Sequence, residues 1–188
     1  RKQQIPVKTS SDTEIVFKTL ISDGIDAVET YNGMFAIAFY DTKEKKMLLI
    51  RDRMGVKPLY YFWDGTNFAF ASEIKALLEF PFIKKNKSIN YTALNEFLHL
   101  GYTGIEGTIY TNIYKVPAGS YIEVSENGIN IQSYWSTYNY IQPETIDDFY
   151  SAKEILRDLV EQDKFIVLII SHNGTLNPYF VRSSVSFP

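Results

Sequence analysis

Residues 33–71 read GMFAIAFYDTKEKKMLLIRDRMGVKPLYYFWDGTNFAFA, and this segment holds the densest strand signals in the chain. Its apolar runs, at about residues 33–40, 47–50, 58–63 and 67–71, are separated by charged or glycine-containing segments. Short apolar runs between turn residues are typical of β-strands. The first run is apolar at nearly every position, which predicts that both of its faces are buried. We therefore predict an antiparallel meander in the middle of the chain.

Helices are expected on both sides of these strands. Ser11 and Glu14 have the spacing of a capping box, and Gly24 is expected to end the helix that they begin. Similar start and stop signals predict helices at residues 25–31, 72–80, 91–100 and 146–162, and turn residues delimit further strands at 120–124 and 129–135. Helices and antiparallel strands combined in this way predict the α+β class.

Two of the predicted helices have specific ends. Ser72 is expected to cap the helix over residues 72–80, and Pro81 to stop it. Asn90 is expected to cap the helix over residues 91–100, and Gly101 to end it. The apolar stripe expected on that helix consists of Leu94, Phe97 and Leu98.

Composition excludes several classes of function. The 188 residues include no Cys, so the chain has no disulfide, thiolate metal site or cysteine nucleophile. Its two histidines, His99 and His172, lie far apart in the sequence, and no metal site is predicted. A net charge of −3 without a Lys/Arg stripe argues against binding to nucleic acid. The longest apolar run, residues 165–170, is too short to cross a membrane, and a cytoplasmic location is expected.

Two segments contain charged residues that could form a site. Asp12 lies in Ser-Asp-Thr-Glu at a loop-to-helix junction, where its carboxylate could bind the ammonium group of an amino acid; a plain helix cap is the commoner use. In RDRMGVKPLYY, residues 51–61, an arginine could clamp a carboxylate or phosphate. The alternative is an internal network in which Asp52 pairs with Arg51 or Arg53.

Two other segments give weaker signals. Ser72 and Glu73 in FASEIKALL, residues 70–78, could line a site, but a strand leading into a capped helix explains the same residues. FIVLIISHNGT, residues 165–175, has the strand-then-loop order of a phosphate site, with one glycine and no Gly-Lys. We interpret it as structural. Taken alone, these features identify no reaction.

In this order, SSDTEIVFKTL, YNGMFAIAFYD, RDRMGVKPLYY and FASEIKALL resemble the N-terminal glutaminase domain of glutamine-hydrolysing asparagine synthases, a class-II glutamine amidotransferase. The resemblance covers about residues 10–135, including LNEFLHLGY and YKVPAGSY. It implies an N-terminal-nucleophile hydrolase-like sandwich of antiparallel sheets flanked by helices, truncated at its N-terminus. The predicted organisation is a partial glutaminase domain at 1–136, a linker at 137–145, and the start of a truncated or disrupted synthetase domain at 146–188.

The resemblance also implies a mechanism. An N-terminal cysteine attacks the side-chain amide of L-glutamine, and the released ammonia passes to a domain that activates L-aspartate with ATP and Mg²⁺. Carried over, Asp12 would bind the α-ammonium group of glutamine, and the residues supporting the site would be Arg51, Asp52, Arg53 and Glu73. No catalytic residue, metal ligand or bound cofactor is assigned to this chain, and a homodimer of the complete enzyme is left open.

Several parts of the family pattern are not found in these 188 residues. They are the nucleophilic cysteine, the arginine segment for the glutamine carboxylate, the Asn-Gly-Glu segment of the oxyanion hole and the Ser-Gly-Gly-x-Asp-Ser loop for pyrophosphate. We therefore expect a fragment, or the product of a disrupted gene, that is inactive alone. Two alternatives remain: a non-catalytic amidotransferase-like binding module, and a class-II amidotransferase with a different acceptor.

Overall fold

The computed structural model describes residues 12–104, 106–140, 150–151, 153–154 and 157–158. The chain divides into two compact units, Arg1–Trp135 and Ser136–Pro188. The described helices of the first unit are α1 (Asp12–Asp23), the 3₁₀ helix η1 (Gly24–Thr30), α2 (Ile74–Leu77), α3 (Pro81–Asn86) and α4 (Tyr91–Leu100). Its strands are β1 (Ala36–Asp41), β2 (Lys46–Arg51), β3 (Tyr60–Trp63), β4 (Phe68–Ala71), β5 (Ile113–Lys115), β6 (Ser120–Ser125) and β7 (Gly128–Ser133).

In the second unit, the short 3₁₀ helix η2 (Thr137–Tyr140) is described, and the described residues between 150 and 158 are helical. Several predictions fall wholly or partly outside the described residues. They are the capping role of Ser11, most of the linker over 137–145, most of the helix over 146–162, the strand over 165–170 and most of the synthetase segment over 146–188. Within the described segments, no helix is long and apolar enough to cross a membrane.

The strands form two antiparallel sheets. Sheet A has the order β1-β2-β6-β7, and sheet B has the order β4-β3-β5. The hairpins β1–β2 and β3–β4 are formed as predicted, but the single meander is wrong because the two hairpins belong to different sheets. The loop over residues 52–59 connects β2 of sheet A to β3 of sheet B. In place of pairing with each other, β2 pairs with β6 and β3 pairs with β5.

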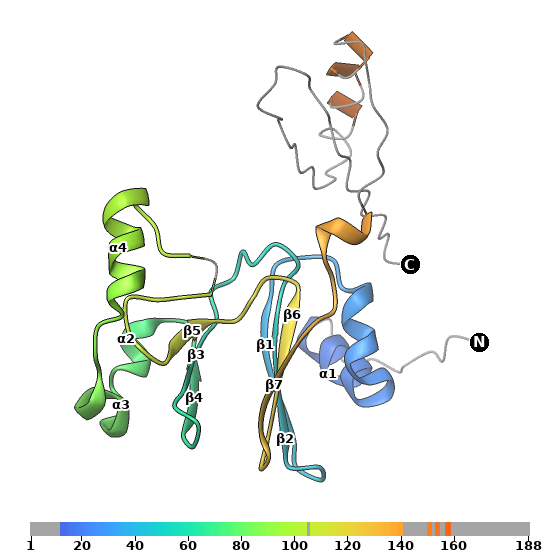
Figure 1. Ribbon diagram of the computed structural model, residues 1–188. Helices are drawn as coiled ribbons and strands as arrows, with labels where there is room; N and C mark the ends of the chain where they lie inside the picture. Colours follow the sequence, from blue (N-terminus) through green and yellow to red (C-terminus); the bar gives the residue numbers. More distant parts are fainter. Residues whose placement is uncertain (1–11, 105, 141–149, 152, 155–156, 159–188) are drawn as a thin grey trace. The chain divides into compact units, whose positions relative to one another are not determined.

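The two sheets pack face to face, and helices cover their outer faces (Figure 1). Leu49 of sheet A and Tyr61 of sheet B share the buried cluster between the sheets. On the outer face of sheet A, Ile50 packs with residues of α1 and η1. On the outer face of sheet B, Phe62 packs with residues of α2 and α3. The expected sandwich of antiparallel sheets flanked by helices is therefore confirmed within the described part of the first unit.

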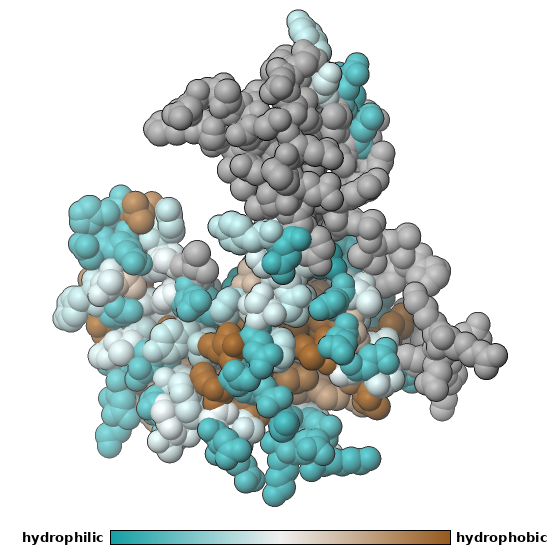
Figure 2. Space-filling view, turned by 45° about the vertical axis from the view of Figure 1, so that its right-hand side comes forward, coloured by the Kyte–Doolittle hydropathy of each residue, from teal (hydrophilic) through white to brown (hydrophobic). Residues whose placement is uncertain are grey.

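The prediction that both faces of the first strand are buried is wrong. Ile37 and Phe39 pack on the cluster that contains α1 and η1 residues, whereas Ala36 and Ala38 are exposed and Tyr40 is 53% exposed. Since β1 is an edge strand of sheet A, its inner face is left open by the other described residues. Figure 2 shows apolar surface in the middle of one face, bordered by hydrophilic side chains.

The segment after β4 contains two short helices in place of the one predicted over 72–80. Glu73, and not Ser72, is the N-terminal cap residue of α2, and no side chain caps that helix by a hydrogen bond. Pro81 lies in the first turn of α3, where the missing N–H of proline removes no helical hydrogen bond. The proline therefore begins a second helix immediately after α2.

The predicted ends of α4 are confirmed, and its predicted buried stripe is wrong. The Asn90 side chain accepts a hydrogen bond from the Ala93 backbone N–H, and Gly101 adopts the left-handed conformation with φ of 79°. Ala93 is the buried residue of this helix. Phe97 and Leu98 of the expected stripe are 42% and 73% exposed. Local capping thus fixed the helix, but tertiary packing buries a different face.

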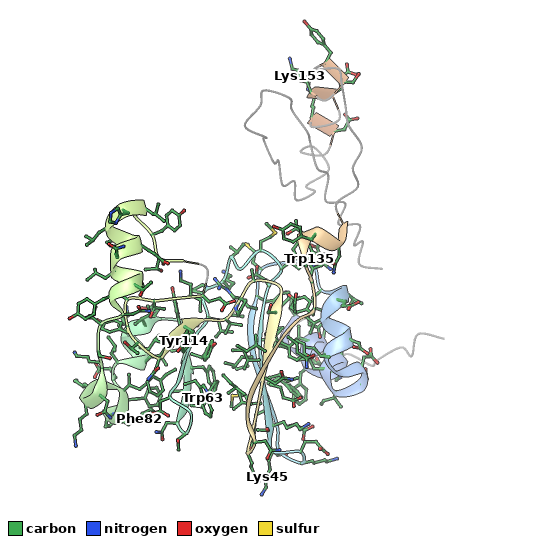
Figure 3. The ribbon with its side chains drawn as sticks, in the orientation of Figure 1. Lys45, Trp63, Phe82, Tyr114, Trp135 and Lys153 are labelled. Atoms are coloured by element: carbon green, nitrogen blue, oxygen red, sulfur yellow. The ribbon has the colours of Figure 1, made fainter. Side chains whose placement is uncertain are left out.

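Aromatic rings fill much of the space between the sheets, where Figure 3 labels Trp63 and Tyr114. The rings of Tyr61 and Tyr114 lie 5.3 Å apart, and Tyr61 and Phe68 are stacked at 6.3 Å. Burial raises the pKa of Tyr61 to about 12, and the charges of Glu106 and Tyr114 add to this effect. The folded protein therefore keeps this phenol protonated where an unfolded chain would release the proton.

This shift predicts how stability depends on alkaline pH. The contribution of Tyr61 is fully present below its ordinary pKa of 10.0 and is lost as the pH rises toward 12. We expect Tyr61→Phe to match the wild type in free energy of unfolding at neutral pH, and to lose less of it above about pH 10. Urea unfolding followed by circular dichroism measures both. Tyr91→Phe, at a residue that is 78% exposed, is the control; identical alkaline losses in Tyr61→Phe and wild type would contradict the prediction.

Candidate functional site

The loop between β2 and β3 contains a buried carboxylate. Asp52 is 1% exposed. Its Oδ1 accepts the backbone N–H groups of Met54 at 3.2 Å and Val56 at 2.9 Å, and its Oδ2 accepts that of Lys57 at 2.9 Å. No ion pair joins Asp52 to either neighbouring arginine, although all three residues are described. The predicted pairing is therefore wrong: backbone amides, and not a cation, compensate the buried charge.

The side chain of Arg51 is bound by carbonyl oxygens of the chain itself. Nε donates to Lys57 at 2.9 Å, Nη1 donates to Val116 at 2.7 Å, and Nη2 donates to Gly55 at 2.6 Å. Gly55 has a φ of 64°, and a Cβ there would lie 3.0 Å from the Cβ of Ala118. Every guanidinium nitrogen is thus occupied inside a close-packed loop. In this structure Arg51 supports the loop and does not point at a ligand.

The end of β7 is fastened to the same loop. The Gly119 N–H donates to the carbonyl oxygen of Asp52 at 2.9 Å, and the Gly119 carbonyl accepts from Tyr134 and Trp135 at 2.9 and 3.0 Å. The Tyr134 hydroxyl donates to the Arg51 carbonyl at 2.8 Å. Burial raises the pKa of Tyr134, with a smaller contribution from the charge of Asp52. A Cβ on Gly119 would lie 2.4 Å from the Trp135 oxygen, so this approach requires glycine.

Arg53 joins the loop to η1 and to the last residue of the first unit. Its Nη2 donates to the carbonyl oxygen of Glu29 at 2.7 Å. Its guanidinium carbon lies 5.8 Å from the ring centroid of Trp135, a residue labelled in Figure 3. Its Nε is buried and has no hydrogen-bond partner. Because that nitrogen is closed off from solvent, it offers no open position for a ligand.

Asp12 and Glu73 lie apart from this network. Asp12 is the exposed first residue of α1, and no hydrogen bond or ion pair joins it to another described residue. Glu73 is exposed and forms a surface ion pair with Lys75 at 2.5 Å. The structure thus brings Arg51, Asp52 and Arg53 together and places Glu73 elsewhere. Support of a glutamine site by these four residues stays a prediction.

Two tyrosines at important positions were missed by sequence reasoning. The Tyr134 hydroxyl binds the Arg51 carbonyl, as described above, and the Tyr31 hydroxyl is hydrogen-bonded to the side chain of Thr19 in α1. Both rings contribute to apolar clusters, so in the sequence they look like ordinary core residues. Their hydroxyl partners come from distant segments, and only the folded chain reveals them.

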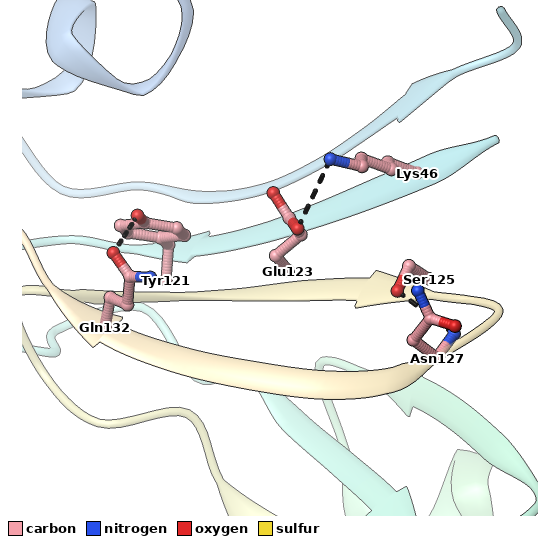
Figure 4. Close-up of polar contacts among 6 residues, drawn as sticks. All are labelled: Lys46, Tyr121, Glu123, Ser125, Asn127 and Gln132. Carbon is pink, nitrogen blue, oxygen red and sulfur yellow. Dashed lines mark hydrogen bonds and ion pairs between the residues drawn. The ribbon is translucent and has the colours of Figure 1, made fainter. Parts of the chain in front are cut away.

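Two polar contacts join neighbouring strands of sheet A. Figure 4 shows an ion pair between Lys46 and Glu123 at 3.5 Å and a hydrogen bond between Tyr121 and Gln132, both across strands of sheet A. Cross-strand pairs of this kind stabilise a sheet by less than about 1 kcal/mol each. Among the described residues, no group of three or more His, Asp and Glu side chains could hold a metal ion.

The Asp52 geometry predicts a large effect of a small substitution. Asp52→Asn keeps the shape but turns an amide N–H₂ toward backbone donors, so we expect a loss of about 2–3 kcal/mol in free energy of unfolding. Urea unfolding followed by circular dichroism measures it. Asp64→Asn is the matched control because that carboxylate also accepts two backbone N–H groups, from Thr66 and Asn67, but is exposed. Comparable losses in the two variants would contradict the structural role of Asp52.

Comparison with known proteins identifies the family of the chain. Residues 1–135 match the family described as the glutamine amidotransferase domain. A putative asparagine synthetase [glutamine-hydrolyzing] 2 of Methanocaldococcus jannaschii is 35% identical over 141 residues, covering 74% of this chain and 27% of the relative. Asparagine synthetase [glutamine-hydrolyzing] 3 of Bacillus subtilis is 36% identical over 153 residues, covering 80% and 25%.

A solved structure of glutamine phosphoribosylpyrophosphate amidotransferase from B. subtilis also aligns, with a TM-score of 0.45 and 20% identity, over 88% of this chain and 34% of that one. The chain spans about a quarter of the length of the two asparagine synthetases it matches. The family match covers more than two thirds of the chain, including both sheets and the loop around Asp52. The chain therefore belongs to the glutamine amidotransferase domain family.

Proposed function

We propose that this chain is the glutamine-binding part of a glutamine-hydrolysing asparagine synthase. In the complete enzyme, L-glutamine supplies ammonia for the ATP-dependent conversion of L-aspartate to L-asparagine, and ATP and Mg²⁺ act on the acceptor side. The observation that carries this proposal is the family match over residues 1–135, together with relatives of 35% and 36% identity that are named asparagine synthetases.

Asp12 is the residue proposed to bind glutamine. Its carboxylate is exposed, and no described residue forms a hydrogen bond or ion pair with it. The α-ammonium group of glutamine is the complementary charge, and a charge-assisted contact of this kind is worth about 1.5–3 kcal/mol. Arg51 and Asp52 contribute indirectly, by holding the loop between the two sheets in one conformation.

This chain is proposed to bind glutamine without hydrolysing it. The resemblance assigns hydrolysis to a cysteine thiolate, and the 188 residues include no cysteine. Binding and hydrolysis can therefore be measured separately on the same protein.

A titration with L-glutamine tests the role of Asp12. We expect Asp12→Asn to weaken binding by about 10-fold to 150-fold, because the substitution removes the negative charge and keeps the size. Isothermal titration calorimetry measures the affinity. Asp23→Asn, at the other end of the same helix, removes the same charge from another exposed carboxylate and should leave the affinity unchanged. Equal affinities of wild type and Asp12→Asn would exclude the assigned role.

A glutaminase assay tests the second part of the proposal. We expect the purified chain to release no glutamate from L-glutamine above the rate of a protein-free control, since the thiol nucleophile is missing. Enzyme-coupled detection of glutamate measures this. Glutamate production that rises in proportion to protein concentration, and persists after repeated purification, would show that another residue performs the attack.

A further inference from the structure

Helix α1, which begins with Asp12, has few buried contacts. Leu20 is its buried residue. Ile15, Phe17 and Ile21 are 43%, 54% and 61% exposed. The ring of Phe17 lies 6.0 Å from that of Phe39 in β1, at the border of the apolar cluster. In the first half of the helix, Val16 packs half-buried against the same apolar cluster. Because apolar packing of this half is limited, a polar contact to it matters for where Asp12 lies.

Tyr31 makes such a contact. Its ring is 8% exposed and packs edge-on against Phe35 at 5.8 Å. Its hydroxyl is hydrogen-bonded to the side-chain oxygen of Thr19 and lies 3.3 Å from the carbonyl oxygen of Val16. Thr19 in turn donates to the carbonyl oxygen of Ile15 at 2.9 Å. A hydroxyl from the segment after η1 is therefore connected to two consecutive backbone carbonyls of α1.

These carbonyls belong to the turn that follows Asp12. Val16 is four residues from Asp12, which corresponds to about 6 Å along an α-helix. Burial raises the pKa of Tyr31, so its hydroxyl keeps its proton at neutral pH and remains able to donate. Each hydroxyl has one proton, so either Tyr31 donates to Thr19 while Thr19 donates to Ile15, or Thr19 donates to Tyr31 while Tyr31 donates to Val16. In both arrangements the Tyr31 hydroxyl is bound to α1.

We propose that Tyr31 is a positioning residue for Asp12: its buried hydroxyl fixes the first half of α1 and thereby the place of the carboxylate. The inference rests on the proposed binding of glutamine by Asp12. A carboxylate–ammonium contact depends on distance and direction, so a helix free to shift by a fraction of a turn holds the ligand less well. The ring of Tyr31 packs in the apolar cluster, whereas its hydroxyl positions α1 through hydrogen bonds.

Tyr31→Phe separates these two roles, because it keeps the ring and removes the hydroxyl. We expect the backbone amides of residues 15–20 to exchange with solvent about threefold to tenfold faster in this variant, as measured by hydrogen–deuterium exchange. Tyr121→Phe is the matched control, since it removes a phenol hydroxyl that is bonded to Gln132 on sheet A (Figure 4) and should leave α1 unchanged. Thr19→Val should reproduce the effect, and Thr19→Ser, which keeps a hydroxyl, should not.

The affinity for L-glutamine tests the link to Asp12. At a temperature where all variants are folded, we expect Tyr31→Phe to raise the dissociation constant by about threefold to tenfold. In an Asp12→Asn background the same substitution should have no further effect, because both changes act on one contact. A merely structural role would lower the thermal midpoint and leave the affinity of the folded protein unchanged.

Each outcome decides a specific point. If the backbone amides of residues 15–20 exchange at the same rate in Tyr31→Phe and wild type, the Tyr31 hydroxyl does not hold α1 in place and the proposal is overturned. Faster exchange with unchanged glutamine affinity, or an equal effect in the Asp12→Asn background, would overturn the positioning role. If the wild type binds no glutamine, the proposed function fails, and the positioning role of Tyr31 fails with it. The exchange data still show whether the Tyr31 hydroxyl holds α1 in place.

Discussion

The carboxylate of Asp52, held by three backbone N–H groups, is the constraint on which the first unit depends. It lies where the chain leaves sheet A for sheet B, so the conformation of its loop sets how the two hairpins meet. The carbonyl oxygen of Asp52 also accepts from Gly55 and Gly119. A change at this one residue therefore affects the loop, the turn before β6 and the end of β7 together.

The side chains of Asp52 and Arg51 bind different backbone groups of the same loop. The carboxylate accepts the backbone N–H groups of Met54, Val56 and Lys57, and the guanidinium donates to the carbonyl oxygens of Gly55, Lys57 and Val116. Met54, Val56 and Lys57 of this loop are exposed, and their backbone N–H groups are bound by the Asp52 carboxylate, not by the ladder of a sheet. The neighbouring opposite charges do not pair with each other, because each side chain binds backbone groups instead.

Local signals in the sequence predicted the elements whose causes are local. The Asp64-Gly65 turn joins β3 and β4, with a φ of 96° at the glycine, and Asn90 caps α4 as its position indicated. The short strand β5 was missed because three residues carry no periodic pattern, and its pairing with β3 comes from the tertiary fold. The exposed inner face of β1 was missed for a similar reason, since burial depends on which element lies opposite.

The candidate site shows the same division. The resemblance singled out Asp12 and residues 51–53, and the structure brings the latter three together in one loop. Their hydrogen-bond partners were predicted wrongly, because charge alone suggested an ion pair. The spacing offered a better signal: Asp52 accepts from residues two, four and five positions later, a local pattern in which an aspartate binds the amides that follow it.

The hydrogen bonds within the chain distinguish the residues of the candidate site. Arg51 and Asp52 belong to the most specific motif of the sequence, yet both side chains are hydrogen-bonded to backbone groups of the chain itself, so the contacts they make in this structure are structural. Asp12 comes from a tetrapeptide that equally fits a plain helix cap, yet no described residue engages its carboxylate. The carboxylate of Asp12 is therefore the group that we propose to test for glutamine binding.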